Sequence, residues 1–243
     1  MHLTDRTPVG VIVAKHPRAD AVFEKYRIDY CCQGDQALGE ACASAGVPVR
    51  RVLDEIARAD EESMHDRDWM TAPLEDVVEH IVAVHHAYLR TELPVLDLRI
   101  SKAAEVCGSS ARPVLAEVGE VFRALASELD LHLRKEETEL FPLIRDYERA
   151  RESGARCRPA ATRGAASVRM ALFESEHKTA AERLREIRRL TGDYALPGDG
   201  GAAFRALSEG LSQLEVSLHR HIHLENNVLF PRTRGLEASF GQA

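Results

Sequence analysis

The sequence has few aromatic side chains and no long apolar run. Phenylalanine, tyrosine and tryptophan make up 5% of its 243 residues, and tryptophan occurs once. No stretch approaches the roughly 20 consecutive apolar residues that span a bilayer. The opening stretch MHLTDRTPVGVIVAKHP has no basic lead, and its apolar part is too short for a signal peptide. We therefore expect a soluble, cytoplasmic protein that does not enter a membrane.

An excess of positive charge is also missing. The chain has 32 Lys and Arg against 39 Asp and Glu, a formal net charge of -7, which disfavours binding to nucleic acid or to an anionic membrane surface. Cysteines are few, odd in number and irregularly spaced. A secreted disulfide scaffold is therefore disfavoured, and reduced thiols in a cytosol fit better. The five cysteines are Cys31, Cys32, Cys42, Cys107 and Cys157.

Patterns typical of β-strands are scarce, so the sequence predicts an all-α protein. Ala, Leu, Glu and Arg dominate stretches in which apolar residues recur every three or four positions. Breaks rich in Gly, Pro and Ser separate four long helices, which indicates an antiparallel four-helix bundle over residues 72–235, after a small helical domain over residues 1–65. The expected long helices span residues 74–106 (with a kink at Pro94), 113–148, 166–190 and 202–229. The expected short helices span residues 9–15, 17–26, a stretch after Cys32, and 48–59.

Histidine, in contrast, is abundant, and part of it lies in an internal repeat. The pattern H-x-x-x-E-x-x-x-L-F-P occurs at His132 with Glu136 and again at His221 with Glu225. A His and a Glu four positions apart share one helix face, and a single such pair is most often exposed. Here leucines continue the same stripe on both helices, so the four polar residues occupy core positions. Buried carboxylates need a cation or a hydrogen-bond network, and a shared metal is the simpler explanation.

Two more histidines fall on the inward stripes of the other long helices. His86 continues the leucine stripe of the first, although a small helix rotation would exchange it with His85, and His177 is the only histidine of the third. Either one alone is more often a hydrogen-bonded core histidine. In an up-down bundle, however, residues at one level lie at equal distances along the chain on either side of the connecting loop. The midpoints between the candidate positions of consecutive long helices fall inside the expected loops. We therefore expect one cluster of His86, His132, Glu136, His177, His221 and Glu225.

Four imidazoles and two carboxylates exceed the four protein donors of a tetrahedral zinc site. If both carboxylates bridge, each of two metal ions receives two His nitrogens and two Glu oxygens. Positions then stay open for an oxo or hydroxo bridge and for an exogenous ligand. Mixed nitrogen and oxygen donors favour iron, with manganese as an alternative. The expected cofactor is an oxo- or hydroxo-bridged pair of iron ions, and the expected small ligands are dioxygen and nitric oxide.

With these motifs the chain resembles the hemerythrin-like di-iron proteins, and within them the repair-of-iron-centres (RIC) family. The segments HLRKEETELFP, HIHLENNVLFP, ESEHKTA and HIVAVHHAYLRTELP carry the resemblance in the bundle, and FEKYRIDYCCQGDQALGEAC carries it in the N-terminal part. The resemblance implies that the six residues bind iron, with Glu136 and Glu225 bridging. It also implies that Glu128 and Glu176 are acids close to the ligands or to a channel.

The adjacent Cys31 and Cys32 come directly after Asp29 and Tyr30, at a point where we expect a helix to begin. A helix N-terminus lowers the pKa of a thiol. A Cys-Cys pair without further context is most often inert packing, but YCCQG is the segment that identifies the N-terminal domain in the resemblance. Adjacent cysteines are poor partners for an ordinary disulfide. The resemblance therefore favours thiolates that hold iron in transit, react with nitric oxide or supply electrons.

The sequence thus predicts a cytoplasmic di-iron protein that repairs iron-sulfur clusters damaged by oxidative or nitrosative stress. Repair would proceed by iron donation or by binding and reduction of nitric oxide, and damaged iron-sulfur proteins would be the clients. A nitric oxide reductase activity and a homodimer both stay open. Two alternatives also stay open: a non-enzymatic oxygen or redox sensor or carrier, and a structural bundle with an internal polar network.

Overall fold

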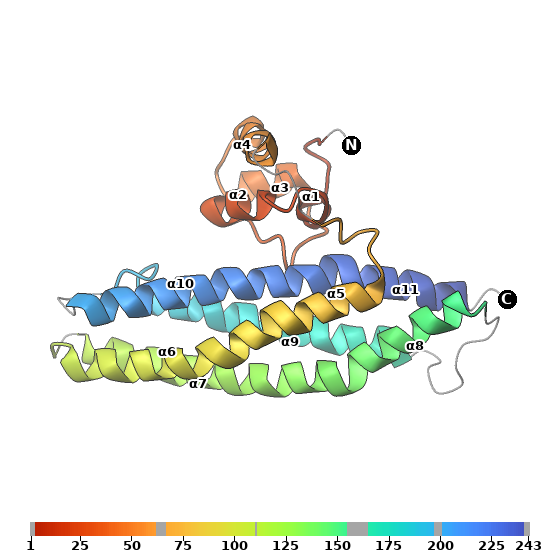
Figure 1. The fold of residues 1–243 in the computed structure, drawn as a ribbon. Coiled ribbons are helices and arrows are strands. Elements are labelled where there is room, and N and C mark those ends of the chain that lie inside the picture. The colour runs from red at the N-terminus through yellow and green to blue at the C-terminus, as the bar shows by residue number, and fades with distance from the viewer. Residues whose placement is uncertain (1–2, 62–66, 110, 155–164, 197–200, 241–243) are drawn as a thin grey trace. The chain divides into compact units, whose positions relative to one another are not determined.

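The computed structural model consists of helices and connecting loops over the residues that it describes (Figure 1). These are residues 3–61, 67–109, 111–154, 165–196 and 201–240. Within them no strand forms, and one isolated bridge joins Pro8 to Ala37. The all-α prediction is confirmed. No helix in these ranges is both long enough and apolar enough to cross a bilayer.

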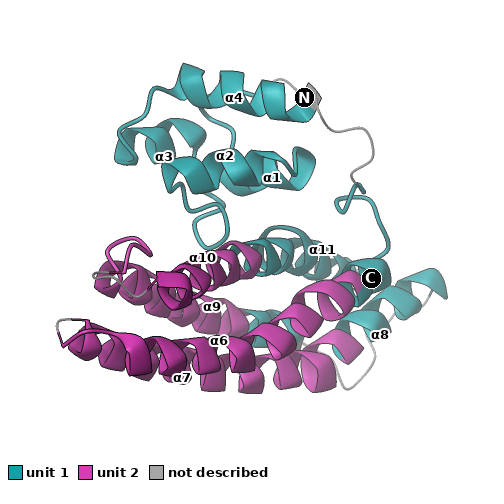
Figure 2. Cartoon of the chain, turned by 60° about the vertical axis from the view of Figure 1, so that its left-hand side comes forward, with its two compact units in different colours: residues 1–79, 143–170, 219–243 teal, residues 80–142, 171–218 magenta. Residues whose placement is uncertain are grey.

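The chain divides into two compact units (Figure 2). Unit 1 contains residues 1–79, 143–170 and 219–243, and unit 2 contains residues 80–142 and 171–218. Each unit joins segments that are far apart in the sequence. The expected domains, residues 1–65 and 72–235, divide the chain differently and stay a prediction.

Unit 2 is built from four long helical segments. The first two carry one π-helical turn each, and all four continue into unit 1. The elements are η1 (Ile81–His86), α6 (Ala87–Val106), α7 (Arg112–Lys135), η2 (Glu136–Leu140), α9 (Ala165–Leu190) and α10 (Gly201–His223).

Polar contacts join each helix of unit 2 to its neighbours. Asp97 of α6 pairs with Arg123 of α7 at 3.3 Å, and Arg183 of α9 pairs with Glu128 of α7 at 2.8 Å. Arg188 of α9 forms a salt bridge of 2.6 Å with Glu215 of α10. Arg99 of α6 donates a hydrogen bond to the Ala206 carbonyl of α10, so each of the four helices contacts two others. Leucines and isoleucines fill the interior. The helical segments of unit 2 therefore form the predicted four-helix bundle.

Unit 1 begins with four short helices. The last of them packs on the second and third, and the first contacts the π-helix η4. The helices are α1 (Val9–Lys15), α2 (Ala19–Tyr26), α3 (Leu38–Ser44) and α4 (Val49–Glu61). The other elements that lie wholly or mainly in unit 1 are α5 (Leu74–His80), α8 (Phe141–Glu152), η4 (Leu224–Leu229) and α11 (Phe230–Ser239).

One expectation about the long helices was wrong at a helix end, and the kink expected at Pro94 stays a prediction. The fourth helix does not end near residue 229, because α11 continues it to Ser239. Helix α6 runs through Pro94, and the irregular turn of this segment lies earlier, at Ile81–His86. Proline in a sequence predicts a stop or a kink, but here the helix continues through Pro231, directly after the π turn Leu224–Leu229.

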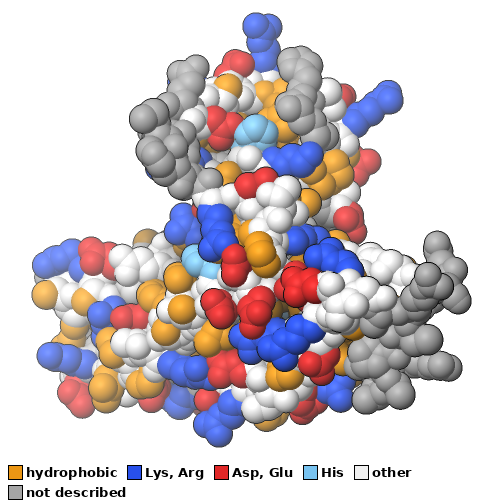
Figure 3. Space-filling view, turned by 45° about the vertical axis from the view of Figure 1, so that its right-hand side comes forward, with side chains coloured by type: hydrophobic (Ala, Val, Ile, Leu, Met, Phe, Trp, Pro, Cys, Tyr) orange, Lys and Arg blue, Asp and Glu red, His pale blue; other side chains and the backbone are white. Residues whose placement is uncertain are grey.

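Acidic and basic side chains are interspersed on the face drawn in Figure 3. Apolar side chains lie among them there in small groups. Such mixing of the two signs is typical of a solvated protein surface.

Candidate metal centre

Three histidines and one glutamate converge in the interior of unit 2. Oε2 of Glu136 lies 3.3 Å from Nε2 of His86, and Oε1 lies 3.0 Å from Nε2 of His132. Nε2 of His177, on α9, lies 3.2 Å from Nε2 of His132. All four residues are at most 4% exposed. Three imidazole nitrogens and both oxygens of one carboxylate therefore face a single small volume.

The second repeat supplies another buried pair. Nε2 of His221 lies 3.4 Å from Oε1 of Glu225, and both residues are fully buried. The potential ligand atoms form two overlapping groups, in each of which they lie within 4.8 Å of one another. Both groups contain both glutamates, and each adds two histidines. One consists of His86, Glu136, His221 and Glu225, and the other of His132, Glu136, His177 and Glu225.

This donor set fits a pair of transition-metal ions. Two groups that each contain two imidazoles and share two carboxylates match the arrangement of di-metal carboxylate proteins, in which side chains on facing helices project into a bundle core. Carboxylates buried this deeply cost several kcal/mol unless cations or hydrogen bonds compensate them. A pair of divalent ions held by these residues would supply that compensation for both glutamates at once.

Both repeats contain a π-helical turn that begins at or beside the glutamate. The Phe141 N–H bonds the Glu136 carbonyl five residues back, and the Phe230 N–H bonds the Glu225 carbonyl in the same way. The next residue is proline in each repeat, and in an α-helix its ring would clash with the carbonyl four residues earlier. A π turn widens the helix there and relieves this clash. The L-F-P ending is thus a signal for an irregular turn that helical periodicity alone does not reveal.

Glu137 holds the orientation of His86, and the sequence reasoning missed it. Its Oε1 lies 2.6 Å from Nδ1 of His86 and 2.8 Å from the guanidinium of Arg90. Nδ1 of His86 therefore donates to Glu137, and Nε2 keeps its lone pair for a metal. Burial acts in the opposite direction, but hydrogen bonds with Arg90 and His86 lower the pKa of Glu137. Its position directly after Glu136 was the available signal.

Glu176 has the same relation to His132. Its Oε2 lies 2.8 Å from Nδ1 of His132, and its other oxygen accepts a hydrogen bond from Lys135. The hydrogen bond with His132, joined by the one from Lys135, lowers the pKa of Glu176 to about 2. Glu176 is adjacent to His177 in the sequence, but it orients His132 from the neighbouring helix.

Glu128 lies elsewhere. Its carboxylate forms two hydrogen bonds with Arg183, at 2.8 and 3.3 Å, and its side chain is 45% exposed. These contacts belong to the surface of unit 2, between α7 and α9. The structure therefore does not bring Glu128 to the ligand cluster, although it lies one turn before His132.

The histidines beside the candidate ligands have other surroundings. The ring of His85 lies edge-on to that of His80, with centroids 5.5 Å apart. His223 is buried against the Tyr30 ring, 5.6 Å away, and burial lowers its pKa to about 4. Nδ1 of His219 lies 2.7 Å from Glu24. His86, and not His85, is the histidine of this helix that faces Glu136.

Cys31 and Cys32 lie in a loop, and the expected helix start there was wrong. The next helix, α3, begins at Leu38. The expected lowering of a thiol pKa is also wrong for Cys31, whose pKa is raised well above its usual range by the hydrogen bond with Cys32 and by burial. The loop leaves α2 through Arg27, which adopts a left-handed conformation with φ 56°. Cys157 lies outside the described residues.

Two asparagines of η4 hold the cysteine loop. Nδ2 of Asn226 donates to the Cys31 carbonyl at 3.1 Å, and Nδ2 of Asn227 donates to the Tyr30 carbonyl at 3.0 Å. A Cβ added to Gly34 would lie 1.9 Å from Oδ1 of Asn227, so this glycine is what lets the loop approach so closely. The loop that carries both cysteines is therefore fixed to the π-helix that contains Glu225.

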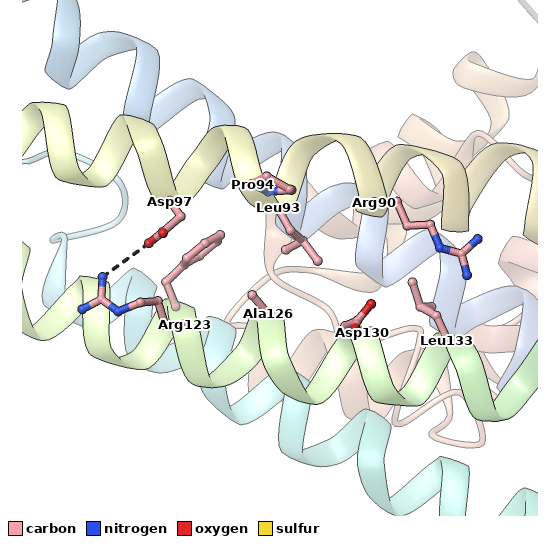
Figure 4. Close-up of a pocket in the computed structure, with 9 residues that line it drawn as sticks. Arg90, Leu93, Pro94, Asp97, Arg123, Ala126, Asp130 and Leu133 are labelled. Atoms are coloured by element: carbon pink, nitrogen blue, oxygen red, sulfur yellow. Dashed lines mark hydrogen bonds and ion pairs between the residues drawn. The ribbon is translucent and has the colours of Figure 1, made fainter.

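A cavity of about 310 Å³ opens between α6 and α7 within unit 2 (Figure 4). Leu93, Pro94 and Ala126 form part of its apolar lining, and the ion pair of Asp97 with Arg123 borders it (Figure 4). Arg90 lines the same cavity and also pairs with Glu137. A solvent-accessible space thus lies one hydrogen-bonded residue away from the carboxylate that orients His86.

A helical bundle with these buried His/Glu groups defines a hemerythrin-like metal-binding protein. Residues 77–233 match the family model described as "Hemerythrin HHE cation binding domain". Residues 5–60 match a second model, ScdA_N, described as a domain of unknown function (DUF542). Both parts of the resemblance found in the sequence are thus present in the expected order.

Similar proteins cover almost the whole chain. The "Iron-sulfur cluster repair protein YtfE" of Escherichia coli O157:H7 is 34% identical over 226 residues, which are 93% of this chain and 95% of that protein. Proteins of the same name from Enterobacter sp. (strain 638) and Citrobacter koseri are 34% and 33% identical, with the same coverage. The chain therefore belongs to the family of hemerythrin-like iron-sulfur cluster repair proteins, and the resemblance to the RIC family is confirmed.

Proposed function

We propose that this protein carries a di-iron centre and repairs damaged iron-sulfur clusters in the cytoplasm. One observation carries the proposal: two overlapping groups of buried His and Glu share two glutamates, in a chain whose relatives are named iron-sulfur cluster repair proteins. Six nitrogen and oxygen donors without a thiolate favour iron or manganese over a structural zinc. The expected clients are iron-sulfur proteins whose clusters have been damaged.

In this proposal each residue has a defined role. Glu136 and Glu225, which belong to both groups, would hold the two ions together with the four histidines. When bound, the two irons supply one-electron redox chemistry and open positions for nitric oxide or dioxygen. Glu137 and Glu176 keep a proton on Nδ1 of His86 and of His132, so that each Nε2 stays available to the metal. Deep burial excludes bulk water from the ligands.

Metal analysis of the freshly purified protein tests the centre. We expect two iron ions per chain and a near-ultraviolet absorption from an oxo or hydroxo bridge. One zinc ion without iron would contradict the assignment. Manganese at two ions per chain would keep the site and change the metal.

A repair assay tests the activity. An enzyme with a nitric-oxide-damaged cluster is incubated with the protein loaded with isotopically labelled iron, and free labelled iron serves as the control. Recovery with label in the cluster supports iron donation, whereas recovery with nitric oxide consumption and no label supports reduction. No recovery beyond the free-iron control, in a protein that holds two irons, would reject the repair function.

A sensor of oxygen or redox state is the second candidate. The observation that favours it is the attachment of the N-terminal helices to η4, which carries Glu225, since a change at the metal could pass to the N-terminal helices. Reversible dioxygen binding without nitric oxide consumption or repair would support the sensor. The same result would exclude both repair routes.

A further inference from the structure

A third group of potential metal-ligating atoms lies in the N-terminal part of unit 1. It consists of Asp29, Cys31 and Cys32, whose ligand atoms lie within 4.8 Å of one another. None of these residues belongs to the two His/Glu groups. Sγ of Cys31 is the central atom, 3.4 Å from Oδ1 of Asp29 and 3.6 Å from Sγ of Cys32.

These distances match the edges of a tetrahedral coordination shell. Two thiolates bound at about 2.3 Å to one tetrahedral ion lie about 3.8 Å apart, and a thiolate and a carboxylate oxygen lie about 3.6 Å apart. The sulfur–sulfur distance of 3.6 Å and the sulfur–oxygen distance of 3.4 Å are close to both values. The three donors could therefore bind one ion with small side-chain movements, whereas the sulfurs are too far apart for a disulfide.

The charge of the group also suits a cation. Asp29 supplies a carboxylate, and hydrogen bonds from the Cys32 N–H, the Cys31 thiol and Gln33 hold it beside the two sulfurs. Cys31 is 3% exposed, while Cys32 and Asp29 are only half-buried. One side of the group thus faces solvent, and an ion that enters from there replaces the thiol protons.

We propose that Asp29, Cys31 and Cys32 form a separate site for one thiophilic divalent transition-metal ion, such as Fe2+, Co2+ or Zn2+. Structural sites of this kind use four protein ligands, whereas sites with three keep a position open. Two thiolates select such ions over Mg2+ or Ca2+. With three protein ligands and an accessible side, the site would bind an ion that can be exchanged.

The surroundings suggest what exchange at this site serves. The Cys31 carbonyl is held by Asn226 and Asn227, the two residues that come directly after Glu225 on η4. An ion on the cysteine loop would therefore lie on the same structural unit as the His221–Glu225 turn. If the chain donates iron, this site would bind an iron ion transiently as the ion enters or leaves the protein. This role rests on the proposed function, whereas metal binding by the three residues does not.

Cobalt titration of the reduced full-length protein, already loaded with iron and kept free of oxygen, tests the site. Co2+ bound by thiolates gives a sulfur-to-metal charge-transfer absorption, and its tetrahedral environment gives strong visible bands. We expect one further equivalent of Co2+ with both signals. Cys31→Ser and Cys32→Ser should each lose the charge-transfer absorption expected for two thiolates, and the iron content should stay unchanged.

Cys42→Ala, in α3 of the same unit, is the matched control and should keep the full signal. Asp29→Asn retains an oxygen for the loop hydrogen bonds but loses the negative charge. It should weaken Co2+ binding by about tenfold or more, because even partners outside the ligand shell are worth that much. The site is rejected if the wild-type protein with its iron in place shows no thiolate signal, or if both Ser variants keep the wild-type signal. Unchanged affinity in Asp29→Asn would remove Asp29 from the proposed ligands.

The outcome is independent of cluster repair. A protein that binds the extra Co2+ but fails the repair assay keeps the third site and loses the proposed function. A protein that repairs clusters but binds no ion at the cysteines keeps the proposed function and loses the third site.

Discussion

The two repeats share one pattern and one backbone geometry, but they differ in the residue directly after the glutamate. Glu136 and Glu225 both precede a phenylalanine whose N–H reaches back five residues to the glutamate carbonyl. After Glu136 comes an acid, Glu137, which orients His86. After Glu225 comes an amide, Asn226, which holds the cysteine loop through a backbone carbonyl.

The repeat thus combines shared positions that face the candidate metal centre with a variable position that contacts neighbouring segments. The shared positions direct a His and a Glu toward the candidate metal centre, and in both copies the helix continues from the Glu in a π turn. The variable position then interacts with whatever lies beside each helix, a histidine of unit 2 in one case and the N-terminal loop of unit 1 in the other. An internal repeat therefore predicts shared chemistry and says little about the neighbours of each copy.

The largest expected effect tests the part that the repeats share. Glu136→Ala and Glu225→Ala should each reduce the metal content well below two ions, because each removes a carboxylate that serves both ions. The free energy of unfolding should fall by about 3–5 kcal/mol, since the remaining buried charges lose a partner. Metal analysis and thermal unfolding measure both effects. Full metal content in either variant would contradict the role of that glutamate.

The next effect tests the part that differs. Glu137→Ala should weaken metal binding by about 10- to 100-fold, because His86 then loses the partner that fixes its ring. Asn226→Ala, at the equivalent position of the second repeat, should leave metal affinity unchanged. Competition with a chromophoric chelator measures both affinities. Equal losses of metal affinity in Glu137→Ala and Asn226→Ala would show that both positions support metal binding to the same extent.

Loosening of the cysteine loop should be smaller. Asn227→Ala removes hydrogen bonds to the Tyr30 and Cys31 carbonyls and should cost about 1–3 kcal/mol of local stability. Faster amide hydrogen exchange in the described residues 3–61, with normal metal content, is the expected readout. Gly34→Ala should act in the same way, because its new methyl group would meet the Asn227 side chain.

Thr138→Ala is the control for the loop variants, because Thr138 holds the position of Asn227 in the first repeat. Its hydroxyl donates to the Arg134 carbonyl of its own helix. Exchange in residues 3–61 should therefore not change in this variant. An equal increase in Thr138→Ala would show that the effect does not come from the loop contacts.

The smallest expected effect concerns the N-terminal helices that the second repeat holds. Hydrogen bonds from Lys25 and Tyr26 lower the pKa of Glu55 to about 2 from an ordinary 4.5. A lowered acid pKa stabilises the folded state above about pH 4.5, and this contribution disappears as the pH falls toward 2. Glu55→Gln should flatten the stability profile in this window, measured by thermal unfolding at several pH values. The exposed Glu40→Gln should leave the profile as it is.

Much of the architecture could be predicted, because helical periodicity reports which side of a helix is buried. The start of α9 was predicted within one residue of Ala165, whereas the continuation through Pro231 was not. Proline preferences describe isolated helices, and here a π turn accommodates the ring. The helix expected at Cys31 failed for a different reason. The loop is held open by Asn226 and Asn227, which lie nearly 200 residues further along the chain.

The sequence by itself determined the helical class, the family and the six candidate ligands, because stripes, repeats and loop lengths are properties of the chain. Only the tertiary structure decided the partners of those ligands. Glu137 orients His86, Glu176 orients His132 from the next helix, and Glu128 faces Arg183 at the surface. Each of these pairs joins residues more than 40 positions apart, and a hydrogen bond depends on where two side chains meet in space.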